Sequence, residues 1–338
     1  MDAPKKLIFV NRQSPGDILM LTAAVRDLHR AYPNRFITDA QTTCMELWEN
    51  NPYITPLDPT QDRVTIIQCH YPMINCANQW AYHFIHGFTD YLNRIMSLSI
   101  RVTDFKGDLY FSPEELARPS IVEQKLGQKV PYWIMVAGGK WDVTIKWWEH
   151  SRFQEVVDRC AGRILFVQVG EKGRHFHPPL RNVLDLRGQT SLRDLALLTY
   201  HAQGVVCPVT AAMHMAAAVP SQPGTKGLKP CVVIAGGREP PHWEAYPGHQ
   251  FIHTVGMLPC CQDGGCWKSR VLPVGDGHLY DMPGNRCQMV VRGILPKCMD
   301  MITSDEVIRR INGYLAGGMA RLLYPTEVQA VKAAGIWP

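Results

Sequence analysis

Short apolar runs alternate with amphipathic stretches along most of this 338-residue chain. Residues 5–11 form an apolar run that predicts a buried strand, and a turn follows at residues 13–17. From residue 18 to residue 28 apolar side chains recur with helical spacing, while Arg26, Asp27, His29 and Arg30 lie mostly on the opposite face. Strand, turn and helix in this order predict the first unit of an α/β layered fold.

The same alternation continues through both halves of the chain. It predicts further strands at residues 35–38, 63–68, 132–136, 164–169, 183–186, 204–207 and 231–235, and helices at 79–96, 148–161, 191–201, 211–219 and 304–315. The last helix opens with a capping-box pattern, in which Thr303 is the N-cap and Glu306 reaches back to it. Strands alternating with helices in both halves predict two doubly wound parallel sheets with a cleft between them.

A polar, proline-bearing stretch near residues 112–126 marks the predicted boundary between two domains. We expect a first domain at 1–125, a second at 126–315 that includes a cysteine-rich segment at 258–300, and a C-terminal helix and tail at 316–338. Both domains are long enough to bury a core of their own.

Composition excludes several classes of protein. With 46% hydrophobic and 19% charged residues, the chain is not mainly disordered. The net charge of +5 without long basic runs argues against a dedicated nucleic-acid binder. The sequence has no apolar run of about 18 residues, and its first apolar run is too short for a secretory signal. We therefore expect a cytoplasmic protein.

The loop after the first strand holds Gly16 and Asp17. Ligands of open α/β sheets bind beyond the carboxyl ends of the strands, where this loop lies. Gly16 permits a tight turn, and Asp17 brings a carboxylate to the start of the next helix. A simpler interpretation is an N-cap aspartate that stabilises the helix by about 1 kcal/mol.

Two further loops suit an anionic ligand. Residues 140–148 (KWDVTIKWW) follow a glycine turn, and a lysine beside backbone amides can neutralise a diphosphate. A solvated lysine next to core tryptophans is the alternative. Thr210 begins a helix of small residues whose N–H groups can approach a phosphate closely. His214, one turn later, is either a ligand contact or a core histidine.

Five of the eleven cysteines fall within residues 260–298: Cys260, Cys261, Cys266, Cys287 and Cys298. Their spacing suits a tetrahedral site of four thiolates, made by Cys266, Cys287, Cys298 and either Cys260 or Cys261. Zinc is the default ion for sulfur ligands and iron also fits. Because four protein ligands leave no open position, the site would be structural. Scattered buried thiols are the alternative.

The ordered set of motifs resembles the ADP-heptose:lipopolysaccharide heptosyltransferases. The resemblance is carried by residues 16–28 (GDILMLTAAVRDL) with Tyr32 and Pro33, and by residues 146–148 (KWW), 182–195 (NVLDLRGQTSLRDL) and 210–218 (TAAMHMAAA). It implies a GT-B glycosyltransferase of two Rossmann-like domains, with the acceptor in the first and the nucleotide sugar in the second. One departure is Val209, where the family usually has an aspartate.

By that resemblance Asp17 is the general base and Lys146 the lysine at the donor phosphate. The donor site would comprise Gly138, Gly139, Lys140, Lys146, Glu171, Thr210, Ala211, Met213, His214, His242 and Trp243. The acceptor side would comprise Gly16, Trp80, His83 and His86. For Glu171, His242 and Trp243, a surface position or ordinary loop packing is the alternative.

The activity so implied is inverting transfer of a sugar, with ADP-heptose the favoured donor and no catalytic divalent cation. The implied acceptor is a hydroxyl group of a glycan, of a lipid-linked sugar or of a protein. A glycan or lipid-linked acceptor would place the enzyme in lipopolysaccharide biosynthesis. One alternative is a protein O-heptosyltransferase acting on Ser or Thr, since the enzymes that modify autotransporters resemble this family and carry cysteine-bound iron. Another, suggested by Val209, is a catalytically silent nucleotide-sugar-binding protein. Association with the inner membrane and homo-oligomer formation stay open.

Overall fold

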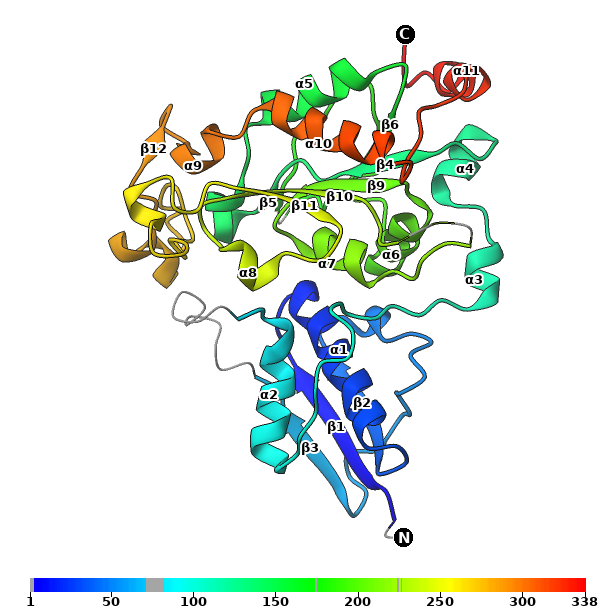
Figure 1. Cartoon of the computed structure of the whole chain (residues 1–338), viewed down its shortest axis with the longest axis vertical. Coiled ribbons are helices and arrows are strands. Elements are labelled where there is room, and N and C mark those ends of the chain that lie inside the picture. Colours follow the sequence, from blue (N-terminus) through cyan, green and yellow to red (C-terminus); the bar gives the residue numbers. More distant parts are fainter. Residues whose placement is uncertain (1–2, 71–81, 174, 224, 226) are drawn as a thin grey trace.

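The computed structural model contains two parallel sheets, one in each half of the chain (Figure 1). It describes residues 3–70, 82–173, 175–223, 225 and 227–338. The smaller half, drawn in blue and cyan, carries the N-terminus, and the larger half, drawn in green to red, carries the C-terminus (Figure 1).

The first sheet has three strands in the order β2-β1-β3, all parallel. They are β1 (Lys5–Asn11), β2 (Phe36–Thr42) and β3 (Val64–Gln68), and the helices α1 (Pro15–Ala31) and α2 (Ile85–Met96) pack against each other beside them (Figure 1). The predicted strands and the first helix are confirmed. The helix predicted at 79–96 begins only at Ile85; residues 79–81 lie outside the described residues.

The second sheet has six parallel strands in the order β11-β10-β9-β4-β6-β8. They are β4 (Tyr132–Met135), β6 (Leu165–Gln168), β8 (Leu184–Asp185), β9 (Gly204–Pro208), β10 (Cys231–Gly236) and β11 (His249–His253). Helices α5 (His150–Cys160) and α10 (Ser304–Ala316) cover one face, and α6 (Leu192–His201) and α7 (Ala211–Ala218) lie on the other, toward the first half (Figure 1). This half is doubly wound, as predicted.

Short elements connect and extend these sheets. They are η1 (Met45–Leu47), α3 (Pro113–Ala117), α4 (Ile121–Leu126), β5 (Gly139–Lys140), η2 (Trp141–Lys146), β7 (His175–Phe176), α8 (Pro241–Glu244), η3 (Pro259–Cys261), η4 (Leu279–Asp281), η5 (Pro283–Asn285), β12 (Val290–Val291), β13 (Leu295–Pro296), α9 (Lys297–Asp300) and α11 (Pro325–Ala333). Among the helices described, none is long and apolar enough to cross a bilayer.

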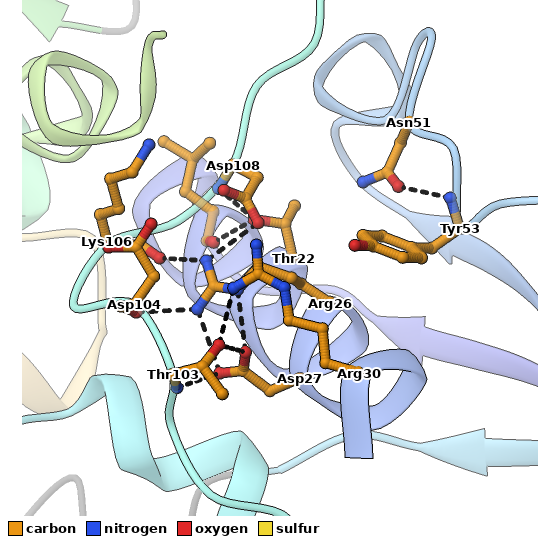
Figure 2. Close-up of polar contacts among 11 residues, drawn as sticks. Thr22, Arg26, Asp27, Arg30, Asn51, Tyr53, Thr103, Asp104, Lys106 and Asp108 are labelled. Carbon is orange, nitrogen blue, oxygen red and sulfur yellow. Dashed lines mark hydrogen bonds and ion pairs between the residues drawn. The ribbon is translucent and has the colours of Figure 1, made fainter. Parts of the chain in front are cut away.

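The face of α1 opposite its apolar stripe is buried at Arg26 and Asp27, which are 1% and 0% exposed. The loop before α3 covers them (Figure 2). Arg26 pairs with Asp27 and Asp108, each at 2.9 Å, and donates to the carbonyls of Asp104 and Lys106 at 2.7 and 2.9 Å. Helical periodicity gives the face on which these residues lie, but it does not show that a loop covers that face.

The N-cap of α10 is only half as predicted. Thr303 Oγ1 accepts a hydrogen bond from the Glu306 amide at 3.3 Å. The Glu306 carboxylate pairs instead with Arg309 and Arg310, both at 2.7 Å. The reciprocal contact of a capping box is therefore replaced by ion pairs along the helix.

The two halves share one apolar core along the contact between α1 and α7. Backbone hydrogen bonds also cross between them, from Leu109 N to Ala218 O at 3.2 Å and from Phe84 N to Trp243 O at 3.0 Å. These contacts hold the start of α1 close to the carboxyl ends of the second sheet.

Candidate active site

The start of α1 touches the second half directly. A Cβ added to Gly16 would lie 2.5 Å from the His214 ring, so this close approach is what requires glycine here. Asp17, half-buried in the first turn, accepts the Ser14 amide at 3.0 Å. The N-cap of α1 is therefore Ser14 and not Asp17; Asp17, at the third position of the helix, caps it by accepting the Ser14 amide.

Lys146 closes η2 on the opposite side of that interface. Its ammonium pairs with Glu239 at 2.8 Å. Burial, and then the positive charge of Arg238, lower the pKa of Lys146 to about 8, while the charges of Glu244 and Asp17 act in the opposite direction. Asp17 and Lys146 therefore lie close enough to interact electrostatically across the two halves.

Lys140 makes a second contact between the same loops. Its Nζ donates to Ser14 Oγ at 2.9 Å, and thus joins the turn after β4 to the turn after β1. The preceding Gly138–Gly139 turn is packed beneath the side chains and backbone of Phe176, His177 and Trp147. Its glycines are therefore needed for this close packing, whatever else they bind.

The N-terminus of α7 lies in the same region. Thr210 is its N-cap, and the Thr210 hydroxyl is buried with no hydrogen-bond partner among the described residues. His214 Nδ1 lies 2.7 Å from the hydroxyl of Tyr246. Burial, and then the charge of Lys146, hold the pKa of His214 well below its ordinary value. His214 is only 6% exposed, and its ring packs against Gly16 in the contact between the halves.

The loop after β10 supplies three charged residues that the sequence analysis missed: Arg238, Glu239 and Glu244. Glu239 and Glu244 are 3% and 7% exposed, and one oxygen of each is buried without a partner among the described residues. Arg238 contacts Glu239 and donates to the Lys268 carbonyl at 2.6 Å. The signal available in sequence was an Arg-Glu pair in a loop at a strand end.

The remaining donor-side candidates are spread around this centre. Met213 and Trp243 pack in the core at 0% and 2% exposure, so neither side chain faces an open surface. His242 is exposed at the start of α8. Glu171 follows β6 at the rim, 3.5 Å from His175. Ala211 is half-buried at the first position of α7.

The acceptor-side candidates are only partly described. His83 and His86 lie at the start of α2, whereas Trp80 falls outside the described residues. Burial lowers the pKa of His83 to about 3, and its ring lies 5.3 Å from that of Tyr246, so it joins the interface. A surface groove of about 500 Å³ opens beside β2 and is lined by Arg12, Asp39, Ala40, Gln41, Thr42, Met45 and Pro56.

The five clustered cysteines do converge. All of them line one cavity of about 10 Å³, which is room for one small ion or one water. Besides burial, the charges of Cys260 and Cys287 raise the pKa of Cys266, to about 11. Cys261 differs, because its thiol donates to the carbonyls of Thr254 and Leu258, each at 3.5 Å.

These thiols stand around the cavity without the geometry of an assembled metal site. In the part of the chain that the structure describes, no three Cys, His, Asp or Glu side chains are arranged so that they could already hold an ion. The cavity nevertheless has the thiol donors that zinc or iron prefers.

Three solved structures are similar to this chain over most of its length. A family 9 glycosyl transferase from Veillonella parvula DSM 2008 has a TM-score of 0.61 at 14% identity, covering 94% of this chain and 99% of its own. E. coli ADP-heptose LPS heptosyltransferase II has a TM-score of 0.55 at 14% identity, and the match covers 93% of this chain and 100% of the E. coli chain. Iron-containing, dodecameric TibC, solved in complex with ADP-D-β-D-heptose, has a TM-score of 0.62 at 15% identity. This match covers 95% of this chain and 78% of the TibC chain. This chain has the family 9 glycosyltransferase fold.

The likeness confirms the predicted α/β fold class with parallel sheets. At 14–15% identity the likeness is one of fold, and no protein-family model and no curated protein matches the sequence. Asp17 comes from one half of this fold and Lys146 from the other. The arrangement of these two side chains is an observation about function that does not depend on the similarity to solved structures.

Proposed function

We propose that the chain is an inverting glycosyltransferase that moves a sugar from a nucleotide donor to an acceptor hydroxyl. The observation that carries this proposal is the contact of the turn at Asp17 with the second half, at Gly16 against His214 and at Ser14 with Lys140 (2.9 Å), which brings the Asp17 carboxylate within electrostatic reach of Lys146. A carboxylate on one side and an ammonium on the other match the two demands of the reaction, which are removal of a proton and stabilisation of a departing diphosphate.

In this mechanism Asp17 takes the proton of the acceptor hydroxyl as that oxygen attacks the anomeric carbon. Attack from the face opposite the diphosphate inverts the anomeric centre. Lys146 and the amides at the start of α7 stabilise the charge that grows on the leaving phosphate. Such fixed positive groups supply what a divalent cation supplies elsewhere. The packed interface between the halves limits access of water, the competing acceptor.

ADP-heptose is the donor that we favour. The buried, unpartnered Thr210 hydroxyl at the start of α7 supports a phosphate-binding role for that helix. TibC, one of the similar structures, was solved with ADP-D-β-D-heptose. Native mass spectrometry after incubation with a panel of nucleotide sugars tests the choice. Retention of an ADP-sugar supports it, and retention of only a uridine or guanosine donor contradicts it. The same spectra report the oligomeric state.

For the acceptor, we propose that the hydroxyl reaches Asp17 from the side of the groove at Arg12. Two classes are in competition, a glycan or lipid-linked sugar and a protein Ser or Thr. Assays of transfer to a serine-rich peptide and to a lipid A-core oligosaccharide separate them. The cysteine cavity supports the protein acceptor, because the autotransporter heptosyltransferases of the sequence resemblance carry cysteine-bound iron and this chain has a cluster of thiols that could hold such an ion.

We further propose that Cys260, Cys266, Cys287 and Cys298 hold one structural ion, iron or zinc. Cys261 is set aside because its thiol already donates to two carbonyls. The cavity would brace the loop after β10, since the Cys266 amide bonds to Gly237 O at 3.1 Å and the Trp267 amide to Arg238 O at 3.2 Å. The ion would thereby fix Arg238 and Glu239 beside Lys146.

A further inference from the structure

Glu244 is a buried carboxylate whose surroundings leave one oxygen unused. It ends α8, is 7% exposed, and its Oε2 has no hydrogen-bond partner among the described residues. Burial raises its pKa, and the nearby charges of Lys146 and Arg238 lower it. A buried acceptor without a partner costs about 1–3 kcal/mol, so a fold keeps one where a ligand completes it.

The position of Glu244 limits which part of a nucleotide sugar can reach it. The carbonyl of Trp243, the preceding residue, accepts the Phe84 amide of the first half at 3.0 Å, so Glu244 lies at the interface between the halves, where the charges of Lys146 and Asp17 both act on its carboxyl. In the proposed reaction Lys146 contacts the phosphate and Asp17 the attacking hydroxyl, so the sugar ring lies between those two groups. A carboxylate repels the diphosphate, whereas it accepts hydrogen bonds from uncharged hydroxyls.

Resting on the proposed function, we propose that Glu244 Oε2 accepts a hydrogen bond from a hydroxyl of the donor sugar and so selects donors that carry it. Glu239 is less suited to this role, because Lys146 already pairs with it at 2.8 Å. Glu244 is therefore a specificity residue for the sugar, while Glu239 is the resting counter-ion of Lys146.

Titration calorimetry with ADP and with ADP-D-β-D-heptose tests this assignment in the full-length wild type and in Glu244→Gln. The substitution keeps the shape of the side chain and removes its charge. We expect ADP to bind Glu244→Gln at least as tightly as the wild type, because a negative charge near the phosphates is gone. ADP-heptose should bind about 5- to 10-fold more weakly, because the amide oxygen of glutamine is a neutral acceptor and a charge-assisted hydrogen bond is about twice as strong as a neutral one. Glu155→Gln, on the exposed side of α5, should change neither affinity.

The outcomes separate this inference from the proposed function. Equal weakening of both ligands overturns it, because that is the result of a structural role. If ADP-heptose binds wild type and Glu244→Gln equally well, the oxygen serves no sugar hydroxyl and the inference falls, while the glycosyltransferase proposal stands. If the wild type binds neither ligand, the proposed donor site falls, and this inference with it.

Discussion

The charge of Lys146 depends on its burial. Burial lowers its pKa to about 8, so it loses its proton near pH 8, well below an ordinary lysine. Because the ammonium is the form that binds phosphate, kcat/KM for the donor should fall as the pH rises through about 8. In Lys146→Arg the guanidinium stays charged, and the fall should move to higher pH. A wild-type profile that stays flat to pH 9.5 would exclude this role.

For single residues, the sequence indicated part of the candidate active site. Asp17, Lys146 and Thr210 could be found because each follows a strand in a recognisable motif. Glu244 could not, because its burial depends on how α8 packs against the first half of the chain. Spacing also could not separate Cys260 from Cys261; only the placement of the Cys261 thiol against backbone carbonyls does so.

Among the elements, α1 is fixed by a buried ion pair at Arg26. Replacing Arg26 by Met leaves Asp27 and Asp108 buried without their partner, and we expect the free energy of unfolding to fall by about 3–5 kcal/mol. Arg30, one turn later, is exposed and bonds the same loop through Thr103 at 2.7 Å, so Arg30→Met should lose less than about 1 kcal/mol. Urea unfolding measures both values. Similar losses in the two variants would mean that burial is not what makes the Arg26 pair important.

The loop after β10 depends on a glycine outside it. Gly265 has φ +125°, and a Cβ there would lie 2.6 Å from the Arg238 carbonyl. Gly265→Ala should therefore displace Arg238, weaken ADP binding several-fold and lower the thermal midpoint, since strain of this kind costs about 1–3 kcal/mol. Gly284→Ala is the matched control, because a Cβ at Gly284 meets no atom within 4 Å. If Gly265→Ala binds ADP like the wild type, the loop does not position the site.

Element order and type followed from periodicity, because most strands here are short apolar runs between amphipathic helices. The exceptions have physical causes. β11 mixes histidine and glutamine with apolar residues, at an edge of the sheet. The start of α2 is set by the contact of Phe84 with Trp243 in the other half, which no local pattern records.

For the whole molecule, the proposed ion in the cysteine cavity predicts a link between metal content and the site between the halves. On that proposal, Cys287→Ser should purify with less iron or zinc than the wild type, unfold at lower temperature and bind ADP more weakly. Cys261→Ser should retain the ion, since Cys261 bonds backbone carbonyls. Elemental analysis of each purified variant, with thermal unfolding, measures the outcome. Loss of the ion from Cys261→Ser with retention in Cys287→Ser would reverse our assignment of the ligands.

The most direct measurement is the rate of sugar transfer from ADP-heptose by the wild type and by Asp17→Asn. With a carboxylate base on one lobe and an anion site on the other, the variant should lose about 10²- to 10⁴-fold in kcat while it still binds the donor. Turnover by Asp17→Asn at the wild-type rate, or a wild type inert toward every donor and acceptor offered, would contradict the assignment of this interface as a glycosyl-transfer site.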